Sequence, residues 1–170
     1  MRRILAVLAS TLALSACATA QRLDAAGDVH TLLTAIRDDD GPAFEAHVDR
    51  PALQREIESR MMRELGRSNV DPAAKLVGAL LGPTVARAAG DLLIQPATFR
   101  YVASTYGYRP SQPLPGRVAI ASMLRPLDDG RVCAVRKKDG PCVLIFTEEA
   151  GAWRLSGFEG DLSELKRKGG

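Results

Sequence analysis

The sequence predicts an α+β domain in which N-terminal helices pack on one face of a C-terminal four-stranded antiparallel meander. Apolar residues recur with the helical period in the first part of the chain, and the period changes to two after Arg117. Helices followed by strands are typical of this fold class. We therefore expect one domain over residues 28–158, divided into a helical part at 28–105, a proline-rich loop at 106–116 and the sheet at 117–158.

The first residues have the three parts of a bacterial signal peptide. Arg2 and Arg3 are followed by the apolar run Ile4 to Leu14 and by the small pair Ser15-Ala16. The apolar run is too short for a transmembrane helix, which needs about 20 residues. We expect residues 1–16 to be a cleaved lipoprotein signal peptide.

The cysteine that follows decides how the chain is anchored. Leu14-Ser15-Ala16-Cys17 resembles the lipobox of bacterial lipoproteins, which implies a diacylated, palmitate-type Cys17 as the new N-terminus and residues 17–27 as a lipidated tether. An aspartate directly after the lipidated cysteine would signal retention in the inner membrane. This chain has Ala18 there, which implies the periplasmic face of the outer membrane. The alternative is cleavage after Ala20 at Ala18-Thr19-Ala20, which would release a soluble periplasmic protein.

The expected mature chain is nearly neutral and large enough for one core. Removing the leader leaves roughly 150 residues, a usual size for one domain. The full chain has 23 basic and 20 acidic residues, and cleavage removes Arg2 and Arg3 from the basic count. Without a large field of one sign, nucleic-acid binding has little electrostatic basis.

The helical part has a regular sequence of apolar stripes and breaks. The stripe residues of its four clearest helices are Val29, Leu32, Leu33 and Ile36, then Phe44 and Val48, then Leu53, Ile57, Met61 and Leu65, and finally Phe99 and Val102. Residues 71–93 are also apolar at helical spacing but are interrupted by Gly82-Pro83 and carry Lys75, Arg87 and Asp91. Charges in a bilayer core cost several kcal/mol each, so we expect kinked core helices, with an interfacial or dimerising role as the alternative.

Three consecutive aspartates raise the question of calcium. An EF-hand loop aligned on Gly41 would need ligands at Ile36 and His47, which cannot serve as anionic oxygen donors. We expect Asp38 to Asp40 to end one helix and cap the next, and we predict no metal site.

Four strands are expected between turn sequences. They are Val118 to Leu124, Val132 to Arg136, Cys142 to Thr147 and Trp153 to Phe158. Asp128-Asp129-Gly130, Lys138-Asp139-Gly140 and Glu149-Ala150-Gly151 supply the turns. Residues 159–170 are expected to be a polar, basic tail.

Cys133 and Cys142 lie on the two strands that flank the second turn. Their odd separation allows them to face each other if the turn register is symmetric, and the periplasm permits a disulfide. Free thiols are the alternative. A redox role is not expected, because the pair lacks the C-x-x-C arrangement at a helix N-terminus.

The sequence has no catalytic signature. It has no G-x-S-x-G, H-E-x-x-H, P-loop or dinucleotide motif, and its two histidines, His30 and His47, have no cysteine or carboxylate at ligand spacing. We expect no catalytic residues and no cofactor.

The proline-rich loop is the best candidate for recognition. Tyr101, Tyr106 and Tyr108 beside Arg109 can stack on a sugar or another planar ligand. A simple connector between helices and sheet is the alternative.

Several short runs resemble the domain of unknown function family 2939 of small proteobacterial envelope proteins. The matching features are Val48-Asp49, Pro51-Ala52-Leu53, Gln95-Pro96 and Trp153-Arg154-Leu155, which cover most of residues 28–158. Arg50 and Gln54 depart from the family pattern. The resemblance implies an architecture and brings no activity.

We therefore expect a non-enzymatic, lipid-anchored periplasmic protein that binds a partner protein or an envelope component. It would contact the membrane through the lipid on Cys17, and its oligomeric state does not follow from the sequence. A small-ligand carrier, with a pocket between sheet and helices as in cystatin-like or NTF2-like folds, is the alternative. An unrecognised hydrolase is the third possibility.

Overall fold

The computed structural model describes residues 2–67, 82, 84–85, 87–88, 90–105, 107–137 and 139–159; for residues 2–17, 65 and 67 we describe the backbone alone. Most of the apolar segment predicted at 71–93, Tyr106 and all but Glu159 of the predicted tail lie outside these residues. The elements in chain order are α1 (Arg2–Asp38), α2 (Gly41–Ala46), α3 (Arg50–Arg67), α5 (Pro96–Thr105), α6 (Arg117–Met123), β1 (Leu124–Pro126), β2 (Val132–Val135), β3 (Cys142–Glu149) and β4 (Ala152–Phe158).

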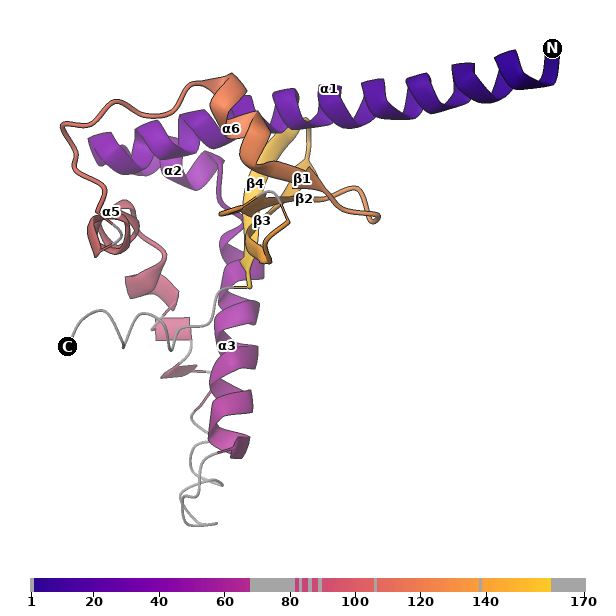
Figure 1. The fold of residues 1–170 in the computed structure, drawn as a ribbon. Coiled ribbons are helices and arrows are strands. Elements are labelled where there is room, and N and C mark those ends of the chain that lie inside the picture. Colours follow the sequence, from indigo (N-terminus) through magenta and orange to yellow (C-terminus); the bar gives the residue numbers. More distant parts are fainter. Residues whose placement is uncertain are drawn as a thin grey trace.

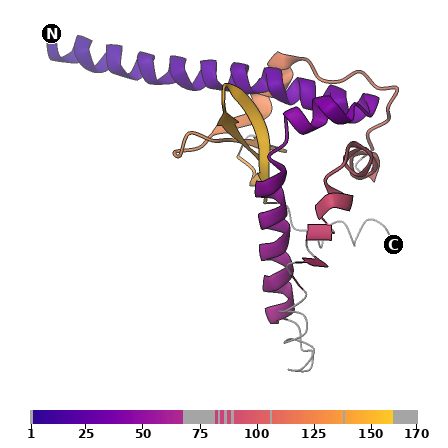
Figure 2. The same cartoon turned by 180° about the vertical axis from the view of Figure 1, so that it is seen from behind.

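The predicted fold class is confirmed: N-terminal helices pack against a four-stranded antiparallel sheet of order β1-β2-β3-β4. In Figure 1, α1 crosses the top of the molecule and its N-terminal half projects beyond the sheet, while α3 runs away from the sheet at a steep angle. Figure 2 shows the same arrangement from behind, with β4 against α1 and α3.

The main core lies between the helices and the sheet. Phe44 of α2, Leu53 of α3 and Trp153 and Leu155 of β4 are among its most deeply buried residues. On β2, Val132 and Ala134 belong to this core, whereas Cys133 and Val135 form a separate small cluster with Cys142. Because side chains alternate along a strand, the cysteines lie on the face of the sheet that points away from the helices.

Both sheet edges are protected from further pairing. Val48 forms an isolated bridge with Leu155, in which Leu155 N donates to His47 O at 2.9 Å and Asp49 N donates to Leu155 O at 2.9 Å. At the other edge, β1 has three residues and ends in Pro126. Short strands and proline limit edge-to-edge association.

The helix break at the three aspartates is confirmed. Asp39 has a positive φ of 59°, and the Asp40 carboxylate accepts a hydrogen bond from Ala43 N at 3.0 Å, which caps α2. Pro42 follows in the first turn, where the missing amide N–H has no helical partner.

Two expectations differ from the structure. The predicted tether at residues 17–27 is part of α1, and Ala25 and Ala26 within it are fully buried. Alanine has the highest helix propensity, and these small side chains let the helix approach its neighbours.

The first predicted strand, Val118 to Leu124, is instead helix α6 followed by the short strand β1. Ile120, Ala121 and Leu124 are buried while Val118 and Met123 are exposed. Burial at positions i, i+1 and i+4 is a helical pattern. In the sequence, Val118, Ile120 and Ser122 are two residues apart, which is also the spacing of side chains on one face of a strand.

Candidate functional site

The β1–β2 turn, β4 and α6 each form a hydrogen bond with the same turn of α1. Gln21 Nε2 donates to Gly130 O in the β1–β2 turn at 2.9 Å, and Trp153 Nε1 donates to the Asp24 carboxylate at 2.9 Å. Arg117 Nη2 of α6 donates to Leu23 O at 3.3 Å. We call these six residues the collar. It fixes the domain on α1 only four residues beyond Cys17 at its nearest point.

Trp153 is the most buried member of the collar, with 2% of its surface exposed. A buried indole N–H needs an acceptor, which Asp24 supplies. The Trp153 backbone N–H donates to Asp28 Oδ2 at 2.7 Å, so two carboxylates one turn apart on α1 hold the start of β4.

Gly27 of α1 has no side chain, and this allows Arg117 of α6 to approach α1 closely. A Cβ atom added at Gly27 would lie 2.8 Å from Arg117 Nη2 and 3.2 Å from Arg117 Cζ. The guanidinium therefore occupies the space above Gly27, from which it reaches the carbonyl of Leu23.

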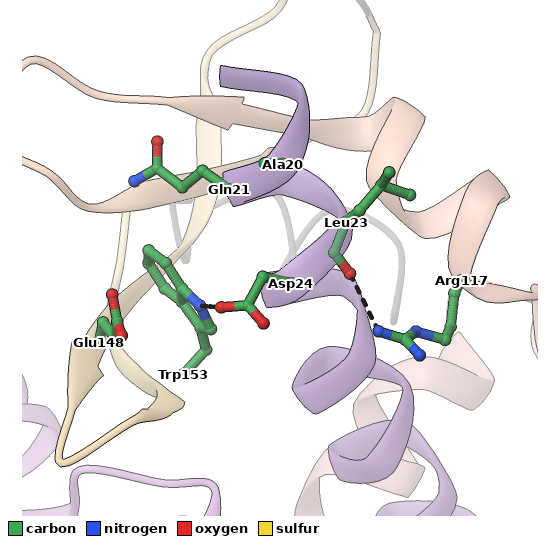
Figure 3. A pocket seen from close by; sticks show the side chains of 7 residues that line it. All are labelled: Ala20, Gln21, Leu23, Asp24, Arg117, Glu148 and Trp153. Atoms are coloured by element: carbon green, nitrogen blue, oxygen red, sulfur yellow. Dashed lines mark hydrogen bonds between the residues drawn. The ribbon is translucent and has the colours of Figure 1, made fainter. Parts of the chain in front are cut away.

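An open hollow of about 730 Å³ adjoins the collar, lined by Ala20, Gln21, Leu23, Asp24, Arg117, Glu148 and Trp153 (Figure 3). Figure 3 shows Trp153 and Glu148 on one side of α1 and Arg117 on the other. The hollow is wide and solvent-open, and the Asp24 carboxylate in it is already bound by the indole.

His47 has a carboxylate neighbour that sequence spacing did not reveal. Its Nε2 lies 3.6 Å from Asp28 Oδ1, and its Nδ1 lies 2.9 Å from Ala43 O. The chain reverses between α1 and α2, which brings the two residues together. In the described part of the chain, no three His, Cys, Asp or Glu residues gather to hold a metal.

The predicted recognition residues that the structure describes have different surroundings. Tyr101 lies on α5 and is 71% exposed, and Arg109 is exposed in the following loop, where its backbone N–H donates to Gln112 Oε1 at 3.2 Å. Tyr108 instead turns its hydroxyl into the protein, where none of the described residues forms a hydrogen bond with it. The pKa of Arg37 is raised by its hydrogen bond to Asp38 and also by Tyr108, which places Tyr108 near the end of α1.

Two exposed leucines precede α5. Leu92 and Leu93, at the start of the connection into α5, are 70% and 48% exposed. Thr98 Oγ1 donates to Leu92 O at 3.1 Å, and Thr98 and Tyr101 are three residues apart on α5, so they are neighbours on one helix face. We call Leu92, Thr98 and Tyr101 the distal patch.

Arginine and aromatic contacts fix the distal patch to the far end of α1. Arg100 Nη1 lies 3.4 Å from Ile36 O, and Arg100 Nη2 lies 3.3 Å from the Asp39 carboxylate. Phe99 packs edge-on against Phe44, with ring centroids 5.4 Å apart. One face of α5 is thus docked, and Tyr101 on another part of the helix is exposed.

The predicted disulfide between Cys133 and Cys142 is present, with Cα atoms 5.5 Å apart. The register is not symmetric: Cys142 pairs with Val135 and Cys133 with Ile145, because a bulge shifts the pairing after Ala134. Arg125 Nη2 lies 3.3 Å and 3.7 Å from the sulfur atoms of Cys142 and Cys133. Disulfides persist in oxidising environments, so the bond indicates an extracytoplasmic domain.

Cys17 lies within α1, and its lipidation stays a prediction. None of the helices in the described part of the chain has both the length and the apolar character needed to cross a membrane.

Comparison with known proteins identifies one family. Residues 5–102 match the family described as "Protein of unknown function (DUF2939)". No curated protein and no solved structure matches the chain. The family resemblance is confirmed over this range, which begins in α1 and ends in α5. The strands and Trp153, which the resemblance had included, lie outside it.

Proposed function

The chain belongs to the DUF2939 family of proteins of unknown function, and we propose that it is a non-enzymatic, lipid-anchored periplasmic protein that binds a partner protein or an envelope component. Cys17 carries the lipid, and the periplasmic face of the outer membrane is its location. The distal patch is the surface that meets the partner.

The position of the collar is the observation that carries this proposal. Only residues 18–20 separate Cys17 from Gln21, and all of them are helical. A lipid on Cys17 would therefore hold the domain directly at the membrane surface with almost no slack. A diffusing carrier or a freely tethered enzyme has no need for such a rigid junction.

The distal patch is well placed for an incoming partner. Arg37 is 14 residues beyond Leu23 on α1, which corresponds to about 20 Å of helix. The exposed side chains of Leu92 and Tyr101 therefore lie away from the anchor, toward the periplasm. Tyrosine is enriched at protein interfaces because its ring buries apolar area and its hydroxyl keeps a polar contact.

Anchoring is tested by comparing the wild-type protein with Cys17→Ser. We expect the wild type in the membrane fraction with an intact mass that includes acyl chains, and Cys17→Ser without them. Equal fractionation and no lipid mass in either protein would contradict the anchor.

Partner binding is tested by photo-cross-linking in cells from position 101, with Lys137 in the β2–β3 turn as an exposed control position. We expect one adduct of defined mass from position 101, none from position 137, and loss of the adduct in Leu92→Glu. Adducts of equal yield from both positions, or an adduct that persists in Leu92→Glu, would contradict the assignment of the distal patch.

A further inference from the structure

We propose that the domain leans on the membrane through a second apolar surface, formed by Leu23 of α1 with Val118 and Met123 of α6. We call these three residues the proximal patch. The proposal rests on the lipid anchor at Cys17 and adds the orientation that the domain takes on the bilayer.

The proximal patch is an apolar surface that the domain does not cover. Val118 is 77% exposed, and Met123 and Leu23 are 42% and 40% exposed. Helix α6 buries Ile120 and Ala121 on its inner side, so its requirement for core packing is already met. The apolar residues on its outer side contribute nothing to the core.

The two elements that carry the patch are joined at one hydrogen bond. Arg117, the first residue of α6, donates a hydrogen bond to Leu23 O, and its guanidinium lies against Gly27. Val118 follows directly in the chain. Leu23 and the outer side of α6 are thus held together by the same arginine that closes the collar.

The proximal patch lies close to the proposed anchor at Cys17, and for this reason we propose that lipid covers it. Leu23 is six residues from Cys17 on a continuous helix, a rise of about 9 Å. Interfacial elements insert their apolar side chains about 5–10 Å into the boundary between headgroups and acyl chains. A lipid on Cys17 therefore brings the bilayer surface within reach of the proximal patch whenever the domain tilts toward α6.

The surrounding charges favour the α6 side. Arg117 is exposed beside Leu23 and Val118 and can meet lipid phosphate groups. On the side of α1 away from Arg117, Figure 3 shows Glu148 and the Asp24 carboxylate, which accepts a hydrogen bond from the Trp153 indole; both border the hollow that Arg117 and Leu23 also line. Carboxylates near a surface of anionic lipid are repelled, so a tilt toward α6 is preferred to a tilt toward the β3–β4 turn.

Position-specific fluorescence on the full lipidated protein tests the tilt. Single cysteines are introduced at Val118, at Glu149 in the β3–β4 turn, and at Tyr101 in the distal patch; each is exposed, and each is labelled with the same environment-sensitive dye. The endogenous Cys133 and Cys142 are bonded to each other. The labelled proteins are bound to vesicles of phosphatidylethanolamine and phosphatidylglycerol, with and without spin-labelled lipid.

We expect a blue shift and quenching by spin-labelled lipid at Val118→Cys, and neither effect at Glu149→Cys or Tyr101→Cys. Flotation of the vesicles distinguishes failure of the proximal patch from failure of the lipid anchor. Protein that floats with the vesicles while the Val118 label stays unchanged would overturn the proximal patch and leave the anchor intact. Protein that does not float at all would overturn the anchor, and the patch with it. Equal changes at Val118 and Glu149 would also overturn the proposed tilt.

A protein occupant gives a different result. If the Val118 label responds only when envelope proteins are added to the vesicles, and not to lipid alone, the surface is a protein interface and the proposal is wrong. In a second variant, Val118→Asp, we expect the lipid-dependent signal of a label at Met123 to be lost while flotation is retained. An unchanged signal at Met123 would contradict a shared apolar contact.

Discussion

The part of α1 that packs against the rest of the domain runs from Gln21 to Asp38, and its two ends are held by different kinds of contact. At the collar, hydrogen bonds join residues 109, 94 and 129 positions apart, and one of them buries a tryptophan. At the other end, Arg37 pairs with its neighbour Asp38, Asp40 caps α2, and Arg100 meets Asp39 at the surface. The N-terminal end is thus held by long-range hydrogen bonds, one of them from a buried tryptophan, whereas the distal end combines exposed ion pairs with the packing of Phe99 on the buried Phe44.

This difference has a physical consequence for stability. Exposed ion pairs contribute about 0–1 kcal/mol each, while loss of a large buried aromatic costs several times more. We therefore expect the domain to resist separation from α1 at the collar and to adjust more easily around α5.

The largest effect is expected from Trp153→Ala. Removing this buried ring should lower the free energy of unfolding by about 3–5 kcal/mol, because a cavity forms and Asp24 loses its donor. Tyr101→Ala, an aromatic truncation on the exposed distal patch, is the matched control and should change stability by about 0.5 kcal/mol or less. Urea unfolding followed by far-UV circular dichroism measures both. Similar losses in the two variants would remove the contrast between the ends.

A smaller effect is expected from Asp24→Ala. The Trp153 indole N–H would lose its acceptor, and an unsatisfied buried donor costs about 1–3 kcal/mol. Asp24→Asn keeps a side-chain oxygen in place and should retain most of the stability. Urea midpoints of the two variants give the comparison. If Ala and Asn are equally destabilising, the hydrogen bond to the indole is not what Asp24 contributes.

At the distal end, Asp40→Ala should cost about 1 kcal/mol, the usual value for loss of an N-cap. The Ala43 N–H would lose its side-chain acceptor at the start of α2. Asp40→Asn, which can also cap, is the control and should be close to the wild type. Hydrogen exchange of the α2 amides should accelerate in Asp40→Ala while Trp153 amide exchange is unaffected. Faster exchange at both places would mean that the ends are coupled.

Local features of this structure followed from the sequence. The breaks and caps at Asp40 and Pro42, the strands that begin at Val132 and Cys142, and the disulfide all depend on residues close together in the chain. Turn residues and alternating apolar positions specify such features directly. The α+β class could be predicted for the same reason.

The features that build the collar could not be predicted in that way. Trp153 and Asp24 are separated by most of the chain, and nothing in either local pattern indicates that they pair. Helix α6 was read as a strand because alternation over seven residues fits both periods. His47 and Asp28 come together only because α2 folds back on α1. In each case the outcome depends on tertiary contacts, which local sequence patterns do not specify.

The smallest effect concerns acid at the distal end. The hydrogen bond from Arg37 lowers the pKa of Asp38 below its ordinary value of 3.8. The pair therefore stabilises the folded state above the pKa of the unfolded chain, and this contribution disappears as the pH falls through the lower pKa of the folded state. In Arg37→Gln, we expect the NMR titration midpoint of Asp38 to move upward, toward the ordinary value. Asp129, whose pKa is lowered by Arg131 in the β1–β2 turn, is the internal control and should keep its midpoint. A shift of both carboxylates would mean that Arg37 acts on the fold as a whole, and the contacts at the distal end would then be less local than the structure indicates.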